Sequence, residues 1–276
     1  MKKQYLYQCL VNFVQPVSTP FLKFSSLLLL PMIALCLPAH AGSAQWSSTN
    51  IQYLYGTTYS SIYFNGETNK LDSEDTSASV ITLEHVNGWK YGDNFYFVDI
   101  TNADRNDPNA ATGYYGELSP RFSLSSITGA PLSGGIIKDV LVTTTAEIGQ
   151  GFHNYLYGLA IDFNIPNTPV AQLNYYIRNE IGAGKDTGQQ ITLVWLKPFK
   201  IGSAAFTFEG FLDYAFAMDH AEDNIIAAPR LLYDLGNSWG SPGCLQVGVE
   251  YQLWRNKFGI DGIDEDVAQV MAKWIW

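Results

Sequence analysis

The sequence feature that most constrains the fold is a strict alternation of apolar and polar residues. The clearest example lies in residues 245–253, where Leu245, Val247, Val249, Tyr251 and Leu253 alternate with Gln246, Gly248, Glu250 and Gln252. A period of two is typical of a β-strand with one apolar and one polar face. Because the pattern recurs at 155–164, 171–178 and 206–216 while helical periodicity is scarce, we expect an all-β chain.

Turn residues divide the chain beyond residue 42 into twelve expected strands. Clusters of Gly, Pro, Asn and Asp separate the alternating segments, for example at 164–169 and 236–243. The expected strands cover residues 48–59, 78–88, 94–103, 113–125, 138–149, 153–164, 170–181, 189–199, 204–217, 225–235, 244–256 and 267–276. No linker, repeat array or change in composition divides this region, so residues 42–276 are expected to form one domain.

The N-terminal 41 residues are typical of a cleaved export signal. They begin with Met1-Lys2-Lys3, contain the apolar run 27–37 and end with Ala39-His40-Ala41. The apolar run is too short to span a membrane, which takes about 18 residues. Removing residues 1–41 takes away three of the 16 basic residues and none of the 26 acidic ones, so the formal charge moves from −10 to −13.

Two all-β architectures fit the alternation: a secreted sandwich that buries its apolar faces, and a membrane barrel that turns them toward lipid. Only 15% of the residues are charged and 14% are aromatic, which suits a surface that faces lipid. The chain ends on Trp274-Ile275-Trp276, with Val270, Ala272, Trp274 and Trp276 on one face. This ending resembles the C-terminal assembly signal of bacterial outer-membrane barrels. We therefore favour an antiparallel transmembrane β-barrel of about twelve strands.

In such a barrel the polar alternates line the interior, and both termini lie in the periplasm. The expected interior carries ten acidic and four basic residues: Glu84, Asp99, Glu117, Glu147, Asp162, Glu180, Glu209, Asp213, Asp234, Glu250, Arg121, Arg178, Arg230 and Lys273. An acidic pore repels anions and admits neutral or cationic solutes. Four aromatic side chains are expected to point inward and could stack on flat rings, although ordinary packing is the plainer interpretation: Phe95, Phe97, Phe211 and Trp254. The acidic charge also argues against binding a nucleic-acid polymer, which needs a basic surface.

Catalytic chemistry finds little support in the sequence. Beyond residue 41 the histidines are His85, His153 and His220, and neither a G-x-S-x-G nor an H-E-x-x-H motif occurs. Cys244 is the single cysteine left after signal removal, which excludes a disulfide framework and a thiolate metal cluster. An outer-membrane hydrolase or acyltransferase with a Ser/His/acid site built across strands is the weaker alternative. We expect no enzyme activity, no catalytic residues, no metal site and no cofactor.

Several motifs in the same order resemble the nucleoside-specific channel-forming outer-membrane proteins, the Tsx and OmpK-like family. The segment 116–123, which contains Glu117, Pro120-Arg121-Phe122-Ser123 and the preceding Ser119, is similar to the family's E-x-x-P-R-F-S region. The segments 157–162, 229–234 and 248–259 show further similarity, the last two to the OmpK-like branch in particular. The resemblance covers most of the chain after the signal.

The resemblance implies a monomeric twelve-stranded barrel for facilitated diffusion of nucleosides, without cofactor or covalent chemistry. Its implied contact residues are first Glu117, Ser119 and Arg121, followed by Glu84, Asp99, Asp162 and Glu250. Arg230 is a further expected lumen residue. The implied partners are outer-membrane lipid, small neutral solutes and, through the last strand, the barrel-assembly machinery. Some family members also bind phage or bacteriocins. The alternative function is therefore a structural or adhesive barrel whose external loops, at 60–76 and 103–112, serve as a receptor.

Overall fold

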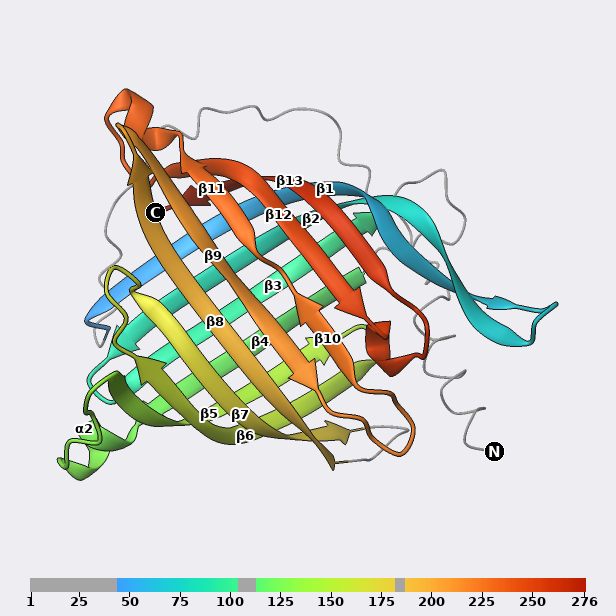
Figure 1. The fold of residues 1–276 in the computed structure, drawn as a ribbon, viewed down its shortest axis with the longest axis horizontal. Coiled ribbons are helices and arrows are strands. Elements are labelled where there is room, and N and C mark those ends of the chain that lie inside the picture. The colour runs from blue at the N-terminus through green and yellow to red at the C-terminus, as the bar shows by residue number, and fades with distance from the viewer. Residues whose placement is uncertain (1–43, 104–112, 182–186) are drawn as a thin grey trace, which may run out of the picture.

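The strands of this protein form one closed antiparallel barrel (Figure 1). The computed structural model describes residues 44–103, 113–181 and 187–276. Their strands are β1 (Trp46–Asn65), β2 (Lys70–Trp89), β3 (Gly92–Ala103), β4 (Gly113–Ser123), β5 (Ile137–Gly149), β6 (Phe152–Phe163), β7 (Val170–Ile181), β8 (Thr187–Ile201), β9 (Ala204–Ala215), β10 (Asn224–Ala227), β11 (Arg230–Asp234), β12 (Leu245–Arg255) and β13 (Glu265–Ile275). Pairing of β1 with β13, from Asn50↔Ile275 to Tyr55↔Val270, closes the barrel.

The short strands β10 and β11 are two halves of one barrel strand. Both pair with β9 on one side and with β12 on the other. Ala228 and Pro229 separate them, and proline has no N–H to donate to the ladder. The Ala228 N–H still bonds to the Phe211 carbonyl at 3.1 Å, and the Pro229 carbonyl accepts from the Tyr251 N–H at 3.0 Å. The barrel therefore has twelve strand positions, which confirms the predicted fold class.

The prediction for the first hairpin is wrong. Residues 60–76 were expected to form a long loop, but β1 and β2 stay paired to Asn65↔Lys70. The register shifts between Gly56 and Tyr59, and beyond this irregularity the two strands continue past the barrel as a projecting ribbon (Figure 1). Both faces of this ribbon carry polar residues, so it lacks the one-sided apolar alternation by which strands are recognised in sequence.

The connections at the opposite end of the barrel include a short helix. The helix α2 (Leu124–Thr128) follows β4, and the Ser123 hydroxyl caps it by accepting the Ser126 N–H at 3.0 Å. Short 3-10 turns η1 (Gly236–Trp239) and η2 (Lys257–Gly259) flank β12. None of the helices in the described part of the chain is long and apolar enough to cross a membrane. The predicted export signal 1–41 and most of the predicted loop 103–112 lie outside the described residues.

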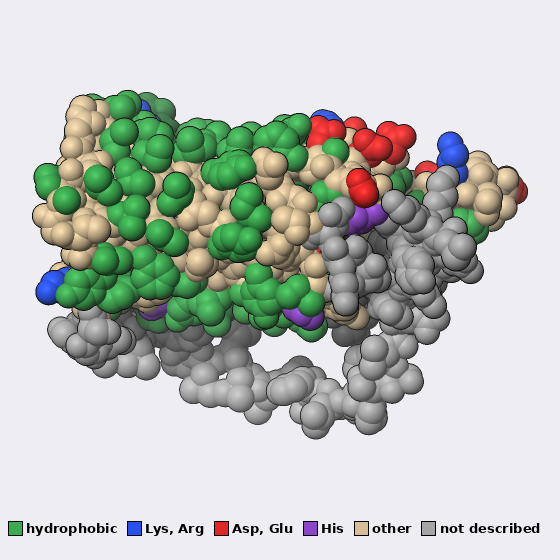
Figure 2. Space-filling model, turned by 90° about the horizontal axis from the view of Figure 1, so that it is seen from below, with side chains coloured by type: hydrophobic (Ala, Val, Ile, Leu, Met, Phe, Trp, Pro, Cys, Tyr) green, Lys and Arg blue, Asp and Glu red, His purple; other side chains and the backbone are tan. Residues whose placement is uncertain are grey.

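The outer wall of the barrel is apolar and the inner wall is largely polar. On β2, for example, Ile81 and Leu83 are exposed at 45% and 51%, whereas the alternate residue Thr82 is 5% exposed. Apolar side chains cover the outer wall between the two ends (Figure 2). This arrangement is the reverse of a soluble sandwich and matches a barrel immersed in lipid.

Candidate functional site

The interior of the barrel is the candidate functional site. All ten residues that the sequence singled out lie on the inward face of their strands: Glu84, Phe95, Phe97, Asp99, Glu117, Ser119, Arg121, Asp162, Arg230 and Glu250. Inward neighbours that the prediction did not name as contact residues include Asn50, Gln52, Thr143, Thr145, Asn154, Gln190 and Gln269, all less than 9% exposed. Strand parity predicts these as well, because each occupies an alternate position beside an outward apolar residue.

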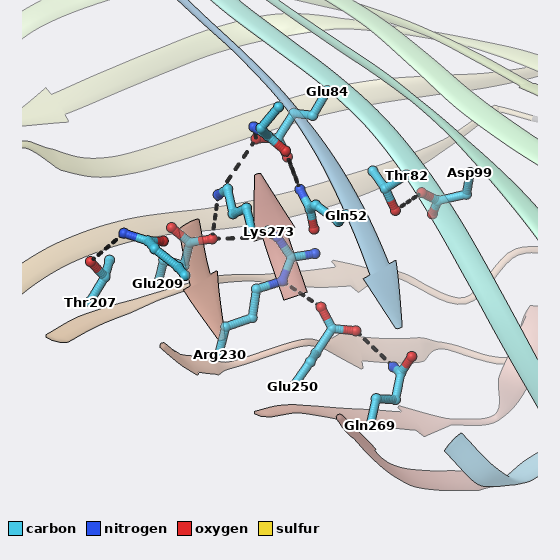
Figure 3. Close-up of polar contacts among 12 residues, drawn as sticks. Gln52, Thr82, Glu84, Asp99, Thr207, Glu209, Arg230, Glu250, Gln269 and Lys273 are labelled. Carbon is cyan, nitrogen blue, oxygen red and sulfur yellow. Dashed lines mark hydrogen bonds and ion pairs between the residues drawn. The ribbon is translucent and has the colours of Figure 1, made fainter. Parts of the chain in front are cut away.

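Five charged side chains from five strands meet inside the barrel, and we call them the ionic cluster: Glu84, Glu209, Arg230, Glu250 and Lys273 (Figure 3). Lys273 Nζ lies 2.7 Å from Glu209 and 3.8 Å from Glu84. Arg230 pairs with Glu250 and lies 3.6 Å from Glu209. The side chains of the four members on β9, β11, β12 and β13 are at most 16% exposed: Glu209, Arg230, Glu250 and Lys273. The ionic cluster therefore fills part of the interior and narrows it.

Neutral side chains complete the hydrogen bonding of the ionic cluster. Asn50 Nδ2 donates to Glu84 at 2.8 Å, and Gln52 Nε2 donates to the same carboxylate at 3.3 Å. Gln269 Nε2 donates to Glu250 at 2.8 Å. Nearby, the Thr82 hydroxyl donates to Asp99 at 2.5 Å. Buried carboxylates need such donors because a buried charge without partners is costly.

Arg121 belongs to a separate ion cluster nearer the terminal end of the barrel, the end that carries Trp276. Its guanidinium donates twice to Asp93, at 2.8 and 2.6 Å, and twice to Asp162, at 2.8 and 3.4 Å. These bonds engage the donors Nε, Nη1 and Nη2. Asp93 lies one residue before the predicted third strand and was not predicted as a partner. Arg121 therefore links β3, β4 and β6 on one side of the inner wall.

Glu117 and Ser119 share the inward face of β4 with Arg121 but make different contacts. Glu117 accepts from the Tyr115 hydroxyl at 2.6 Å and lies opposite Glu147 in the ladder. Glu147 in turn accepts from Arg178 at 2.7 Å and from Asn154 at 2.8 Å. Ser119 accepts from Thr145 at 2.9 Å. Glu117, Ser119 and Arg121 therefore lie on the same face of β4, but they have different partners and do not form a single site.

Four inward aromatic rings form a continuous surface, the aromatic wall: Phe95, Phe97, Tyr115 and Phe152. Successive ring centroids lie 5.7, 5.7 and 6.2 Å apart across β3, β4 and β6. Phe95 and Phe97 were predicted to point inward, whereas Tyr115 and Phe152 were not singled out. By strand order, this wall lies across the barrel from β9 to β12, which carry most of the ionic cluster.

Apolar side chains also meet inside the barrel. Leu54, Val80, Leu232 and Met271 form a buried cluster from β1, β2, β11 and β13. Because β11 is not hydrogen-bonded to β1 or β2, this cluster joins strands that are not neighbours in the sheet. Within the described residues, no group of three or more His, Cys, Asp or Glu side chains is placed to hold a metal ion. The interior thus offers stacking surfaces and charged hydrogen-bonding groups.

Sequence comparison identifies the kind of barrel. A model of the family described as nucleoside-specific channel-forming protein, Tsx, matches residues 49–264. The chain belongs to this family. Outer membrane protein OmpK of Vibrio parahaemolyticus is 27% identical to it over 225 residues, which cover 76% of this chain and 84% of the relative. These matches confirm the resemblance that the motifs around Glu117 and Arg121 indicated.

As a member of the Tsx family, the protein is an integral channel of the bacterial outer membrane. Two solved porins are also similar in structure. The KdgM porin aligns with a TM-score of 0.46 and 10% identity over 82% of this chain and 98% of its own. The NanC porin has the same score and identity over 83% and 99%.

Proposed function

We propose that this Tsx-family channel carries nucleosides, or solutes of the same uncharged, ring-bearing kind, by facilitated diffusion. The observation that carries the proposal is the aromatic wall on one side of an interior whose other side holds the ionic cluster. A nucleoside has a flat apolar base and a hydroxylated sugar, so it can use both sides at once. The name of the matched family supports the same solute class.

The two sides of the interior suit different parts of such a solute. Base stacking on an aromatic side chain contributes about 1–3 kcal/mol, which is enough to favour entry without trapping the solute. The carboxylates of Glu84, Glu117 and Glu250 can accept hydrogen bonds from sugar hydroxyls. Asp99 and Asp162 are further acceptors, and Arg230 and Ser119 can donate. A phosphorylated solute would meet the excess of carboxylates and be repelled.

Uptake into liposomes that contain the purified protein tests the proposal. Thymidine or adenosine should enter several-fold faster than a neutral disaccharide of similar mass. Equal rates would reduce the protein to a small general pore, and no flux through a folded barrel would contradict the proposal.

A matched pair of variants on β3 tests the aromatic wall itself. Phe97→Ala removes an inward ring, and Tyr96→Ala removes the outward ring beside it. We expect the first to lower the preference for nucleoside over disaccharide about tenfold, from a stacking energy of about 1–3 kcal/mol, and the second to leave it unchanged. An equal change in both variants would show that the wall does not select the solute.

One observation favours a second function, that of a surface receptor. The β1–β2 ribbon projects beyond the barrel (Figure 1), which makes it accessible to a phage or bacteriocin.

We also propose that residues 1–41 are removed on export, that the mature barrel is a monomer, and that the strand ending at Trp276 engages the assembly machinery.

A further inference from the structure

Exposed charged side chains separate by sign between the two ends of the barrel. In the described part of the chain, those at the terminal end are all lysines: Lys90, Lys138, Lys197 and Lys200. Those at the opposite end are acidic except for Lys70: Glu67, Glu74, Asp75, Asp219, Glu222, Asp261, Asp264 and Asp266. Acids gather beside the projecting ribbon in Figure 2. Among the described residues, this rim exposes lysine side chains and no acidic side chains. Such a rim attracts anionic lipid head groups, and each lysine near such a surface contributes about 1 kcal/mol.

One of these lysines borders a cavity on the outer surface. The cavity has a volume of about 290 Å³ and lies at the turn between β6 and β7. Its polar lining includes Lys138, Asn164 and Asn167, and its apolar lining includes Phe163 and Ile165. Phe163 and Lys138 both lie on the outward face of their strands, opposite in parity to the inward Asp162 and Asp139. The cavity therefore opens toward the lipid at the terminal rim.

The backbone holds the polar groups of this cavity in place. The ladder between β5 and β6 shifts register between Ile137 and Asp139, which leaves Lys138 without a partner in the ladder. Such a bulge redirects a side chain. Across the cavity, Ile165 and Thr168 bridge a tight turn with Asn167 at φ 56°, and the Thr168 N–H donates to the Ile165 carbonyl at 3.1 Å. Asparagine tolerates this left-handed conformation.

We propose that this cavity binds the head group of an anionic phospholipid, of the phosphatidylglycerol type, from the periplasmic leaflet. The Lys138 ammonium pairs with the phosphate, and the carboxamides of Asn164 and Asn167 donate to phosphate or glycerol oxygens. Phe163 and Ile165 contact the start of an acyl chain, which continues along the apolar outer wall. The site is independent of the solute that the channel carries.

Native mass spectrometry of the purified barrel, with phosphatidylglycerol and phosphatidylcholine in equal amounts, tests this site. We expect retention of phosphatidylglycerol over phosphatidylcholine. Lys138→Gln should weaken this retention about fivefold, as expected for about one lysine contact. The control Lys90→Gln removes the same charge from the same rim, at the turn between β2 and β3 and away from the cavity, and should have a much smaller effect.

Three results would overturn the proposal: no preference between the two lipids, equal losses in the two lysine variants, or displacement of the lipid by inorganic phosphate at equal concentration. The last would identify a phosphate site in place of a lipid site. If Lys138→Gln fails to fold, Asn167→Gly replaces it as the test. This variant keeps the left-handed turn and removes one carboxamide, so it should also weaken retention of the lipid. Heat-modifiable electrophoretic mobility reports folding of each variant.

Discussion

Arg230 is the residue on which much of the charge balance in the interior depends. It contacts both Glu209 and Glu250 with its side chain 16% exposed. Breaking a buried pair by removing one partner costs about 3–5 kcal/mol, because the other charge stays buried without compensation. We therefore expect Arg230→Met to lower the free energy of unfolding by about that amount. Urea titration of the barrel in detergent, followed by tryptophan fluorescence, measures the change.

A second substitution separates charge imbalance from lost packing. In Arg230→Met/Glu250→Gln, the carboxylate that Arg230 neutralised is also removed, while Gln269 can still hydrogen-bond at position 250. Glu209 keeps Lys273 at 2.7 Å. The double variant should recover more than half of the lost stability. If it is as unstable as the single variant, packing of the Arg230 side chain, and not its charge, supports the barrel.

Gly158 stands where the backbones of β6 and β7 approach too closely for a side chain. A Cβ atom at this position would collide with the Tyr175 carbonyl oxygen. Overpacking of this kind typically costs about 1–3 kcal/mol, so Gly158→Ala should lower the urea midpoint. Gly66→Ala is the control, because a Cβ at Gly66 has no atom within 4 Å. Equal stability of the two variants would contradict this account of β6.

At the scale of elements, the β1–β2 ribbon is separable from the barrel. Beyond the irregularity at Gly56 and Tyr59, residues 62–65 and 70–73 pair only with each other in the sheet. Replacing residues 62–73 by Asn-Gly would join Ser61 to Glu74, its partner in the register, through a favoured hairpin turn. We expect an unchanged urea midpoint and nucleoside uptake within about twofold of the parent, since neither the ladder below nor the interior is altered.

The same deletion discriminates the two proposed functions. If the protein serves as a receptor, phage adsorption to cells that produce the shortened protein should fall while uptake persists. Loss of uptake with an intact barrel would instead show that the ribbon takes part in solute entry.

Strands were predictable from sequence where lipid and interior impose opposite chemistry on alternate residues, as in β12. The ribbon was not, because residues 60–76 meet the same solvent on both faces. Parity also predicted which residues point inward, including Glu117, Ser119 and Arg121. It could not predict that Arg121 pairs with Asp93 and Asp162 while Glu117 bonds to Tyr115. Such partners depend on strand tilt and stagger, which alternation does not encode.

At the scale of the whole molecule, the distribution of charge predicts how the channel discriminates. The interior carries more carboxylates than cations: Asp93 and Glu265 add to the acids expected from sequence, and Lys257, which pairs with Glu265, adds one cation. The exposed acidic side chains at the end opposite Trp276 are negative, like the interior. An anionic solute therefore meets repulsion at that entrance and again inside, whereas a neutral nucleoside meets neither.

Salt dependence tests whether this field, and not the width of the interior, excludes anions. In about 0.1 M salt the screening length is about 10 Å, and in about 1 M it falls to about 3 Å. Thymidine should enter liposomes at least tenfold faster than thymidine monophosphate in low salt, and the ratio should shrink several-fold in high salt. Thymidine uptake itself should stay constant, which serves as the internal control. A ratio that does not respond to salt would mean that size excludes the phosphate, because steric exclusion is not screened by ions.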